Sequence, residues 1–180
     1  MIREFKPEYP RFAELQKQLI DIAIEQDLEN IFSHPDGQLA VQTDGSNDLH
    51  SGVGSSIGKD NNWETTFNQI HPMFKETLVE DYFNWLGVPV YRTRLMCARE
   101  KSSYSMHKDS SPRLHLPIKT NKQCFFMLAQ PKNNSFEQLD ASLYHLPADG
   151  KTTWIDTRNI HNFINGSTER RLHLVMVVKE

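Results

Sequence analysis

The sequence predicts a mainly β fold with flanking α-helices, and three observations support this prediction. Two segments before residue 88 have the apolar spacing of amphipathic helices. Beyond residue 88, short runs of branched and aromatic residues are separated by turn-forming clusters, which is typical of antiparallel β-sandwiches and barrels. The chain has 180 residues, enough for one domain with a sizeable buried core. We therefore expect a jelly roll supported by helices on one side.

The first half of the chain is expected to supply two helices and the loop between them. Residues 9–29 predict the first helix, because apolar residues recur there at three- and four-residue intervals between charged ones. The same spacing appears after Pro72 and ends at Gly87, a residue type that often terminates helices. Residues 43–62 are rich in Gly, Ser, Asn and Asp, which favour turns. They predict a mobile loop, either a lid over a site or a plain surface linker.

Eight short strands are expected in the second half of the chain. Their predicted ranges are 88–98, 102–107, 112–118, 123–130, 140–147, 152–156, 160–164 and 169–178. The tetrapeptide Arg-Leu-His-Leu occurs twice in these strands, at 113–116 and 171–174. Because side chains alternate between the two faces of a strand, each tetrapeptide places its arginine and histidine on one side and its leucines on the other.

Composition argues against several classes of protein. The chain has 20 Lys plus Arg against 23 Asp plus Glu, a formal charge of -3, which does not favour a broad surface for nucleic acid. Cys97 and Cys124 lie in apolar surroundings, so we expect buried free thiols and a reducing, cytoplasmic location. The chain has no apolar run near its start and no stretch approaching the roughly 20 apolar residues of a membrane span. We expect no membrane association.

His107 and Asp109 form the first part of a candidate metal site. Residues two apart in an extended segment project from the same side, so this pair aims an imidazole and a carboxylate together. His161, from a distant predicted strand, is expected to supply the third ligand. Two histidines and one carboxylate on one face of an octahedral ion leave positions for a co-substrate and oxygen, which suits non-haem Fe(II) oxygenases. The same donors also bind Zn(II), Ni(II) and Cu(II), so ligand type alone does not fix the metal.

Arg171 is the candidate anion-binding residue. It begins a strongly apolar last strand, and an arginine directed into a barrel needs an anion to offset its burial. A carboxylate fits, because the planar guanidinium fork matches its two oxygens. An edge-strand arginine in solvent is the alternative, and Arg170 competes for the same role. Arg113 and His115 either help to hold an acidic co-substrate or serve as partners of acidic side chains.

These residues resemble the aspartyl/asparaginyl β-hydroxylase-like branch of the Fe(II)/2-oxoglutarate-dependent dioxygenases. The similarity comprises His107-Lys-Asp109, Arg113-Leu-His115-Leu-Pro-Ile, the lead-in from Gly150 to Asp156, and His161 followed ten residues later by Arg171-Leu172. It covers residues 88–178, about half of the chain. Several of these hydroxylases lack the carboxylate of the triad, whereas Asp109 is present here, so the family's substrates are not carried over.

The resemblance implies a double-stranded β-helix, the cupin-like jelly roll, with His107, Asp109 and His161 binding Fe(II). It also implies that Arg171 binds the distal carboxylate of 2-oxoglutarate. The strands of the two Arg-Leu-His-Leu segments are neighbours in that fold, with both arginines facing the pocket. The whole chain, 1–180, would then be a single dioxygenase domain. Residues 1–87 would form the helical support and mobile loop, and residues 88–180 the β-rich metal-binding core.

The first expected function is that of an oxygenase that hydroxylates an amino-acid side chain, free or within a peptide or protein, with molecular oxygen as the second substrate. Two alternatives stay open. A non-catalytic cupin-like module would bind a metal or small molecule without needing a carboxylate clamp. A zinc hydrolase would use three protein ligands and a metal-bound water. This alternative does not account for Arg171.

Overall fold

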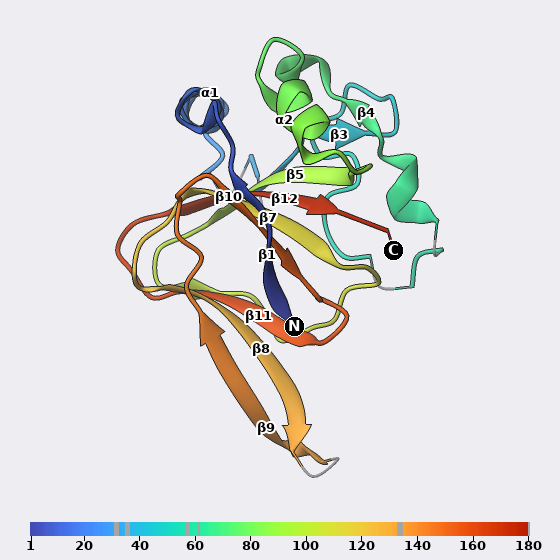
Figure 1. Cartoon of the computed structure of the whole chain (residues 1–180). Helices are drawn as coiled ribbons and strands as arrows, with labels where there is room; N and C mark the ends of the chain where they lie inside the picture. The colour runs from blue at the N-terminus through green and yellow to red at the C-terminus, as the bar shows by residue number, and fades with distance from the viewer. Residues whose placement is uncertain (31–32, 35–36, 57, 61, 133–134, 180) are drawn as a thin grey trace.

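The computed structural model describes residues 1–30, 33–34, 37–56, 58–60, 62–132 and 135–179, which form two facing antiparallel β-sheets and two α-helices (Figure 1). The larger sheet runs in the order β1 (Ile2–Glu8), β10 (Lys151–Ile155), β7 (Arg113–Lys119), β12 (Arg171–Val177), β5 (Tyr91–Ala98), β2 (Gln38–Ala40). The smaller one runs β6 (Ser102–Ser103), β11 (Ile160–Asn165), β8 (Cys124–Lys132), β9 (Ser135–Tyr144). A separate pair joins β3 (Gln42–Thr43) to β4 (Gln69–Ile70). The predicted jelly roll is confirmed.

Both α-helices lie on the outer face of the six-stranded sheet, away from the smaller sheet (Figure 1). They are α1 (Phe12–Glu25) and α2 (Val79–Leu86), and two 3-10 turns, η1 (Trp63–Thr66) and η2 (Pro72–Phe74), precede α2. Both helices were predicted, but α2 begins later than expected because Phe74 belongs to the separate turn η2. No helix in the described ranges is both long enough and apolar enough to cross a membrane.

Alternation along the central strands separates a helix-facing core from the space between the sheets. Leu114 and Leu116 of β7, with Leu172 and Leu174 of β12, are buried in the apolar cluster that also contains α1 and α2. Their neighbours in the sequence, the arginines and histidines, therefore point toward the smaller sheet. β7 and β12 are adjacent and antiparallel, as the resemblance implied. The two tetrapeptides are staggered, however, and their only direct pairing is Leu116 with Leu174.

Residues 1–87 contribute more than helices and a loop, because β1 and β2 form the two edges of the six-stranded sheet. Neither strand was predicted from the sequence. Three of the seven β1 side chains are partly buried and the rest are exposed, so the apolar alternation of a half-buried strand is weak. β2 has three residues, too few to show a period of two.

The segment 43–62 has no helix over its described residues and only Thr43 is in a strand, while residues 57 and 61 lie outside the described set. It is attached to the sheet by Arg92, whose Nε donates to the Gly52 carbonyl at 2.8 Å and whose Nη2 donates to the Gly54 carbonyl at 2.6 Å. Gly54 also lines the cavity described below. The irregular segment was predicted correctly, and its mobility stays a prediction.

Gly87 ends α2 in the left-handed conformation with φ 69°, which an L side chain adopts at a cost of about 1 kcal/mol. Among the described residues, the one heavy atom that a Cβ added there would meet within 4 Å is Lys6 Nζ, at 4.0 Å, so the cost is conformational rather than steric. We expect Gly87→Ala to lower the free energy of unfolding in urea by about 1 kcal/mol, and Gly87→Asn by less, because asparagine tolerates this region better. Equal stability of all three proteins would contradict the assigned cap.

Candidate metal centre and its cavity

A short backbone bridge brings the two predicted histidine ligands together. The N–H of His107 donates to the carbonyl of His161 at 3.0 Å, and the N–H of His161 donates to the carbonyl of His107 at 2.9 Å. Their ring centroids are 4.3 Å apart. Beyond His107, the N–H of Asp109 donates to the Thr157 carbonyl at 2.8 Å, which keeps this segment beside β11. Asp109 therefore projects toward the same space as the imidazoles.

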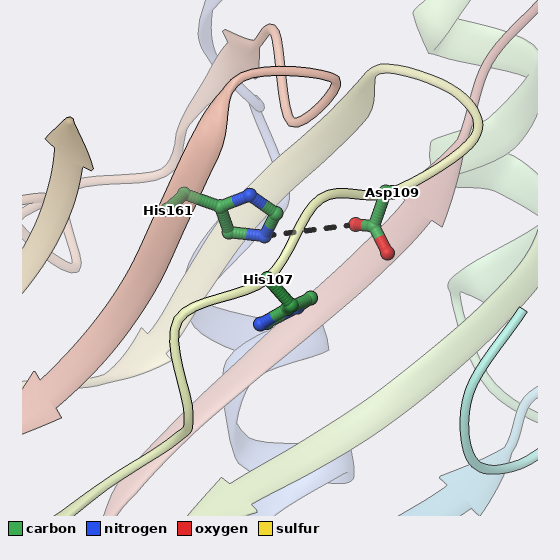
Figure 2. A group of neighbouring side chains, drawn as sticks. All are labelled: His107, Asp109 and His161. Carbon is green, nitrogen blue, oxygen red and sulfur yellow. Dashed lines mark ion pairs between the residues drawn. The ribbon is translucent and has the colours of Figure 1, made fainter. Parts of the chain in front are cut away.

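The three predicted ligands converge on one point (Figure 2). One ligand atom from each of His107, Asp109 and His161 lies within 4.8 Å of the others. Asp109 Oδ2 is 3.7 Å from His161 Nε2, the contact drawn as a dashed line in Figure 2. Residues 52 positions apart in the chain thus meet because β11 pairs with the segment that precedes β7.

Both histidines are held with their Nε2 atoms available to a metal. His107 Nδ1 is 2.8 Å from the Ser105 carbonyl, and His161 Nδ1 is 2.9 Å from the Asn159 carbonyl. A carbonyl only accepts, so each Nδ1 carries a proton, and the lone pair of the neutral ring is therefore on Nε2. Burial lowers the pKa of His161, although its bond to Asn159 acts in the opposite direction. The neutral ring is the form that ligates metals.

Arg113 fixes the third ligand rather than standing free in the cavity. Its Nη2 is 3.3 Å from Asp109 Oδ1 and 2.7 Å from Glu64 Oε1, and its Nη1 donates to the Ser111 carbonyl at 2.8 Å. Pairing with acidic side chains was one of the two roles expected for this arginine. The contact occupies one oxygen of Asp109 and leaves the other facing His161.

Glu64, in η1, is a buried carboxylate that the sequence analysis did not identify. Its side chain is 2% exposed and accepts from Arg92 Nη1 at 3.1 Å, from Arg113 Nη2 at 2.7 Å and from Ser110 Oγ at 2.8 Å. Burial by itself raises the pKa of Glu64, but Arg113, neighbouring serine hydroxyls and Arg92 lower it to about 2. Glu64 is therefore ionised and neutralises part of the charge of two buried arginines. No local pattern in the sequence marks this long-range role.

The metal-ligand cluster opens into a cavity of about 530 Å³ that also contains Arg171. Such a volume is within the range of small-molecule sites. Arg171 is 3% exposed, its Cζ lies 3.2 Å from the centre of the Phe163 ring, and its Nη2 contacts His173 Nδ1. The Nε of Arg171 is buried and has no hydrogen-bond partner among the residues that the structure describes, and burial lowers the pKa of Arg171 to about 9. Arg170, the competing candidate, is partly exposed and pairs with Glu29.

His115 lines the same cavity, and both of its ring nitrogens are buried and have no hydrogen-bond partner in the described part of the chain. Burial, followed by the charges of Arg171 and His161, lowers its pKa well below the ordinary value. The ring is therefore neutral, with one nitrogen able to donate and the other able to accept a hydrogen bond. Buried polar atoms of this kind are normally paired, so the cavity is suited to a polar ligand near His115.

Arg94 of β5 also lines the cavity and was not identified from the sequence. A signal was present, because Arg92 and Arg94 occur at alternate positions in a strand that also contains Leu95 and Cys97. The argument applied to Arg171, that an arginine in an apolar strand needs an anion, applies equally to this pair. Glu64 supplies the anion for Arg92.

The donor set fits a divalent transition metal. Two imidazoles and one carboxylate on one side of an ion match the facial triad of non-haem Fe(II) sites, and the same donors accept Zn(II) or Ni(II). The adjoining cavity leaves room for a ligand on the other side of the ion. An arrangement of this type can bring a metal-chelating anion and a second molecule together within one pocket.

No family model matches this chain, and no curated protein matches it. Solved structures that are similar to this chain include the following three, each with its sequence identity, TM-score and the share of each chain that is covered. AviO1 from Streptomyces viridochromogenes Tue57 is 12% identical, with TM-score 0.49, over 97% of this chain and 87% of that protein. An oxidoreductase of the 2OG-Fe(II) oxygenase family from Burkholderia pseudomallei is 15% identical, with TM-score 0.40, over 63% and 55%. A cupin domain from Bordetella pertussis is 16% identical, with TM-score 0.35, over 51% and 82%.

Proposed function

We propose that this chain is an Fe(II)/2-oxoglutarate-dependent dioxygenase that hydroxylates an amino-acid side chain, free or within a peptide or protein. The observation that carries the proposal is the presence, in one cavity, of a two-histidine, one-carboxylate cluster and a buried arginine, Arg171, without a carboxylate partner among the described residues. A metal site alone would not require such an arginine. A dicarboxylate that chelates the metal at one end and meets the guanidinium at the other uses both features.

His107, Asp109 and His161 would hold Fe(II), which together with 2-oxoglutarate and molecular oxygen supplies the oxidising chemistry. The chain's own contribution is positioning. The Nδ1 bonds of the two histidines fix their ring orientation, and Arg113 fixes Asp109. The walls of the cavity keep a bound substrate close to the metal and limit the access of water.

Arg171 would bind the distal carboxylate of 2-oxoglutarate through its free Nε and the adjacent Nη. His115, neutral and unpaired, would complete the co-substrate site by donating a hydrogen bond to a carboxylate oxygen. Arg113, which was expected to share in this site, contacts Glu64 and Asp109. We therefore assign it to the metal side of the cavity, where it positions the Asp109 ligand.

The proposal includes the aspartyl/asparaginyl β-hydroxylase-like branch as the family, on the strength of the ordered motif from His107 to Arg171. It also includes a cytoplasmic location. Cys97 and Cys124 are both buried and unpaired, which fits a compartment that keeps thiols reduced.

The test of the proposed function is an anaerobic titration of the protein with Fe(II) and 2-oxoglutarate, followed by admission of oxygen. We expect the weak visible charge-transfer band of the iron chelate to appear, and succinate to form once oxygen is present. A metal-binding module of the cupin type would bind the ion but would form no succinate. Absence of both the band and succinate would reject the dioxygenase.

The adjacent residues Arg170 and Arg171 allow the same substitution to be compared inside and outside the proposed co-substrate site. Arg171→Gln removes the buried cation, and we expect a roughly 10- to 100-fold weaker affinity for 2-oxoglutarate, since hydrogen bonds to charged groups contribute about 1.5–3 kcal/mol. Iron binding measured without 2-oxoglutarate should change little. Arg170→Gln removes a partly exposed arginine and should leave both affinities near those of the parent. Equal effects of the two substitutions would show that Arg171 does not bind the co-substrate.

A further inference from the structure

Arg94 presents an unused hydrogen-bonding edge inside the cavity. Its side chain comes from β5 and is 7% exposed. Only Nη1 is bonded within the described part of the chain, to Gln38 Oε1 at 2.7 Å and to the Gly54 carbonyl at 3.5 Å. Among the described residues, Nε is buried without a partner and Nη2 has no hydrogen bond. The edge formed by Nε and Nη2 is therefore available to a ligand.

Two other buried arginines, Arg92 and Arg113, already have carboxylate partners. Arg92 and Arg113 share the carboxylate of Glu64, and Arg113 also contacts Asp109. Arg94 has no carboxylate partner among the described residues. Its pKa is lowered to about 9, first by burial and then by the charges of Arg92 and Arg113. An anion arriving beside Arg94 would offset both effects.

Arg94 and the proposed co-substrate site occupy different places on the sheet. Arg94 pairs with Val175 of β12, and Val175 pairs with His115 of β7. Arg171 pairs with Ala98, four residues further along the same two strands. At about 3.3 Å per residue, the two arginine backbones are separated by roughly 13 Å. One small diacid bound through Arg171 and the metal therefore leaves Arg94 for another molecule.

We propose that Arg94 binds a carboxylate of the primary substrate, so that the molecule to be oxidised enters as an anion beside Gln38 and Gly54. This inference deepens the proposed function and rests on it. Two N–H groups on one edge of a planar guanidinium match the two oxygens of a carboxylate. Such a contact would fix one end of the substrate, so that its remaining atoms extend along the cavity toward the metal ligands.

The experiment uses the anaerobic complex of the protein with Fe(II) and 2-oxoglutarate. It is titrated with the standard L-amino acids and their N-acetyl forms, each compared with the corresponding carboxamide, while the charge-transfer band is followed. We expect at least one acid to shift the band and its carboxamide to have no effect at the same concentration. In Arg94→Gln the band should remain, and the concentration of that acid needed for half the shift should rise about 10- to 100-fold.

Control variants and a melting curve distinguish failure of the Arg94 assignment from failure of the proposed function. Arg11→Gln, the same substitution at an exposed arginine, should titrate like the parent, and a melting curve checks that Arg94→Gln is folded. Arg94→Lys keeps the charge without the planar fork, so we expect it to restore only part of the affinity. A band that no acid shifts, or that acids and carboxamides shift alike, would overturn this inference while the proposed function stands. A shift caused by inorganic phosphate alone would overturn the assignment of a carboxylate, and absence of the band would reject the proposed function itself.

Discussion

His161→Ala should remove metal binding almost completely. The substitution deletes the most buried of the three ligands, at 4% exposure, and leaves only His107 and Asp109 of the cluster to hold an ion. Even loss of a residue that merely orients a ligand costs 10- to 100-fold in metal affinity, so loss of the ligand itself should cost at least about 100-fold. Competition with a coloured chelator for Fe(II) measures this change, and succinate formation should become undetectable.

A histidine outside the cavity serves as the control for this prediction. His50→Ala removes an exposed imidazole that contacts His34, and we expect its iron affinity to equal that of the parent. The melting temperature of each metal-free variant shows whether the fold is retained. Unchanged iron affinity in a folded His161→Ala protein would rule out the three-residue metal centre.

Glu64→Gln should produce the largest loss of stability among substitutions near the cavity. Glu64 is ionised, almost wholly buried and bonded to Arg92 and Arg113. Removing one partner of a buried ion pair typically costs about 3–5 kcal/mol, because the remaining charges are left uncompensated. We expect a decrease of that size in the free energy of unfolding in urea. Glu14→Gln, which breaks an exposed pair with Arg11, should change the free energy of unfolding little, because solvent screens exposed ion pairs.

The lowered pKa of Glu64 predicts how the stability of the protein depends on pH. The pKa of Glu64 is about 2 in the folded protein against an ordinary value of 4.5. Because the pKa of Glu64 is lower in the folded than in the unfolded protein, its contribution to stability is fully present above pH 4.5. This contribution is lost as the pH falls toward 2. Stability of the parent should therefore decline more steeply over this interval than that of Glu64→Gln. Parallel declines would show that Glu64 does not titrate as the structure implies.

Most of the sheet could be predicted from the sequence because its strands have marked alternation. The eight expected strands correspond to β5 to β12, although only Ser102 and Ser103 of the range 102–107 are in a regular strand. The edge strands β1 and β2 were missed, since an exposed edge has weak alternation and three residues carry no period. Their positions depend on pairing with β10 and β5, which are distant in the sequence.

Residues of the candidate site could be predicted where the nearby sequence alone indicates their role. His107 and Asp109 share a side because they are two apart in an extended segment, and the structure brings His161 to them. Arg171 was identified because a cation at the start of an apolar strand requires an explanation. The nearby sequence gives no such indication for Glu64. It lies in the short 3-10 turn η1, and its arginine partners come from β5 and β7, so only the tertiary structure reveals its role.

The stagger of the two identical tetrapeptides places their arginines at different ends of the cavity. The strands run in opposite directions, so Arg113 lies opposite Val177 while Arg171 lies opposite Ala98, toward the other end of β12. Of the two tetrapeptide arginines, Arg113 therefore has its counter-ions in place, whereas Arg171 has no carboxylate partner among the described residues. Because Arg94, near the level of Arg113, also has none there, the cavity has one guanidinium toward each end that is available to an anion, which suits two separate anionic groups.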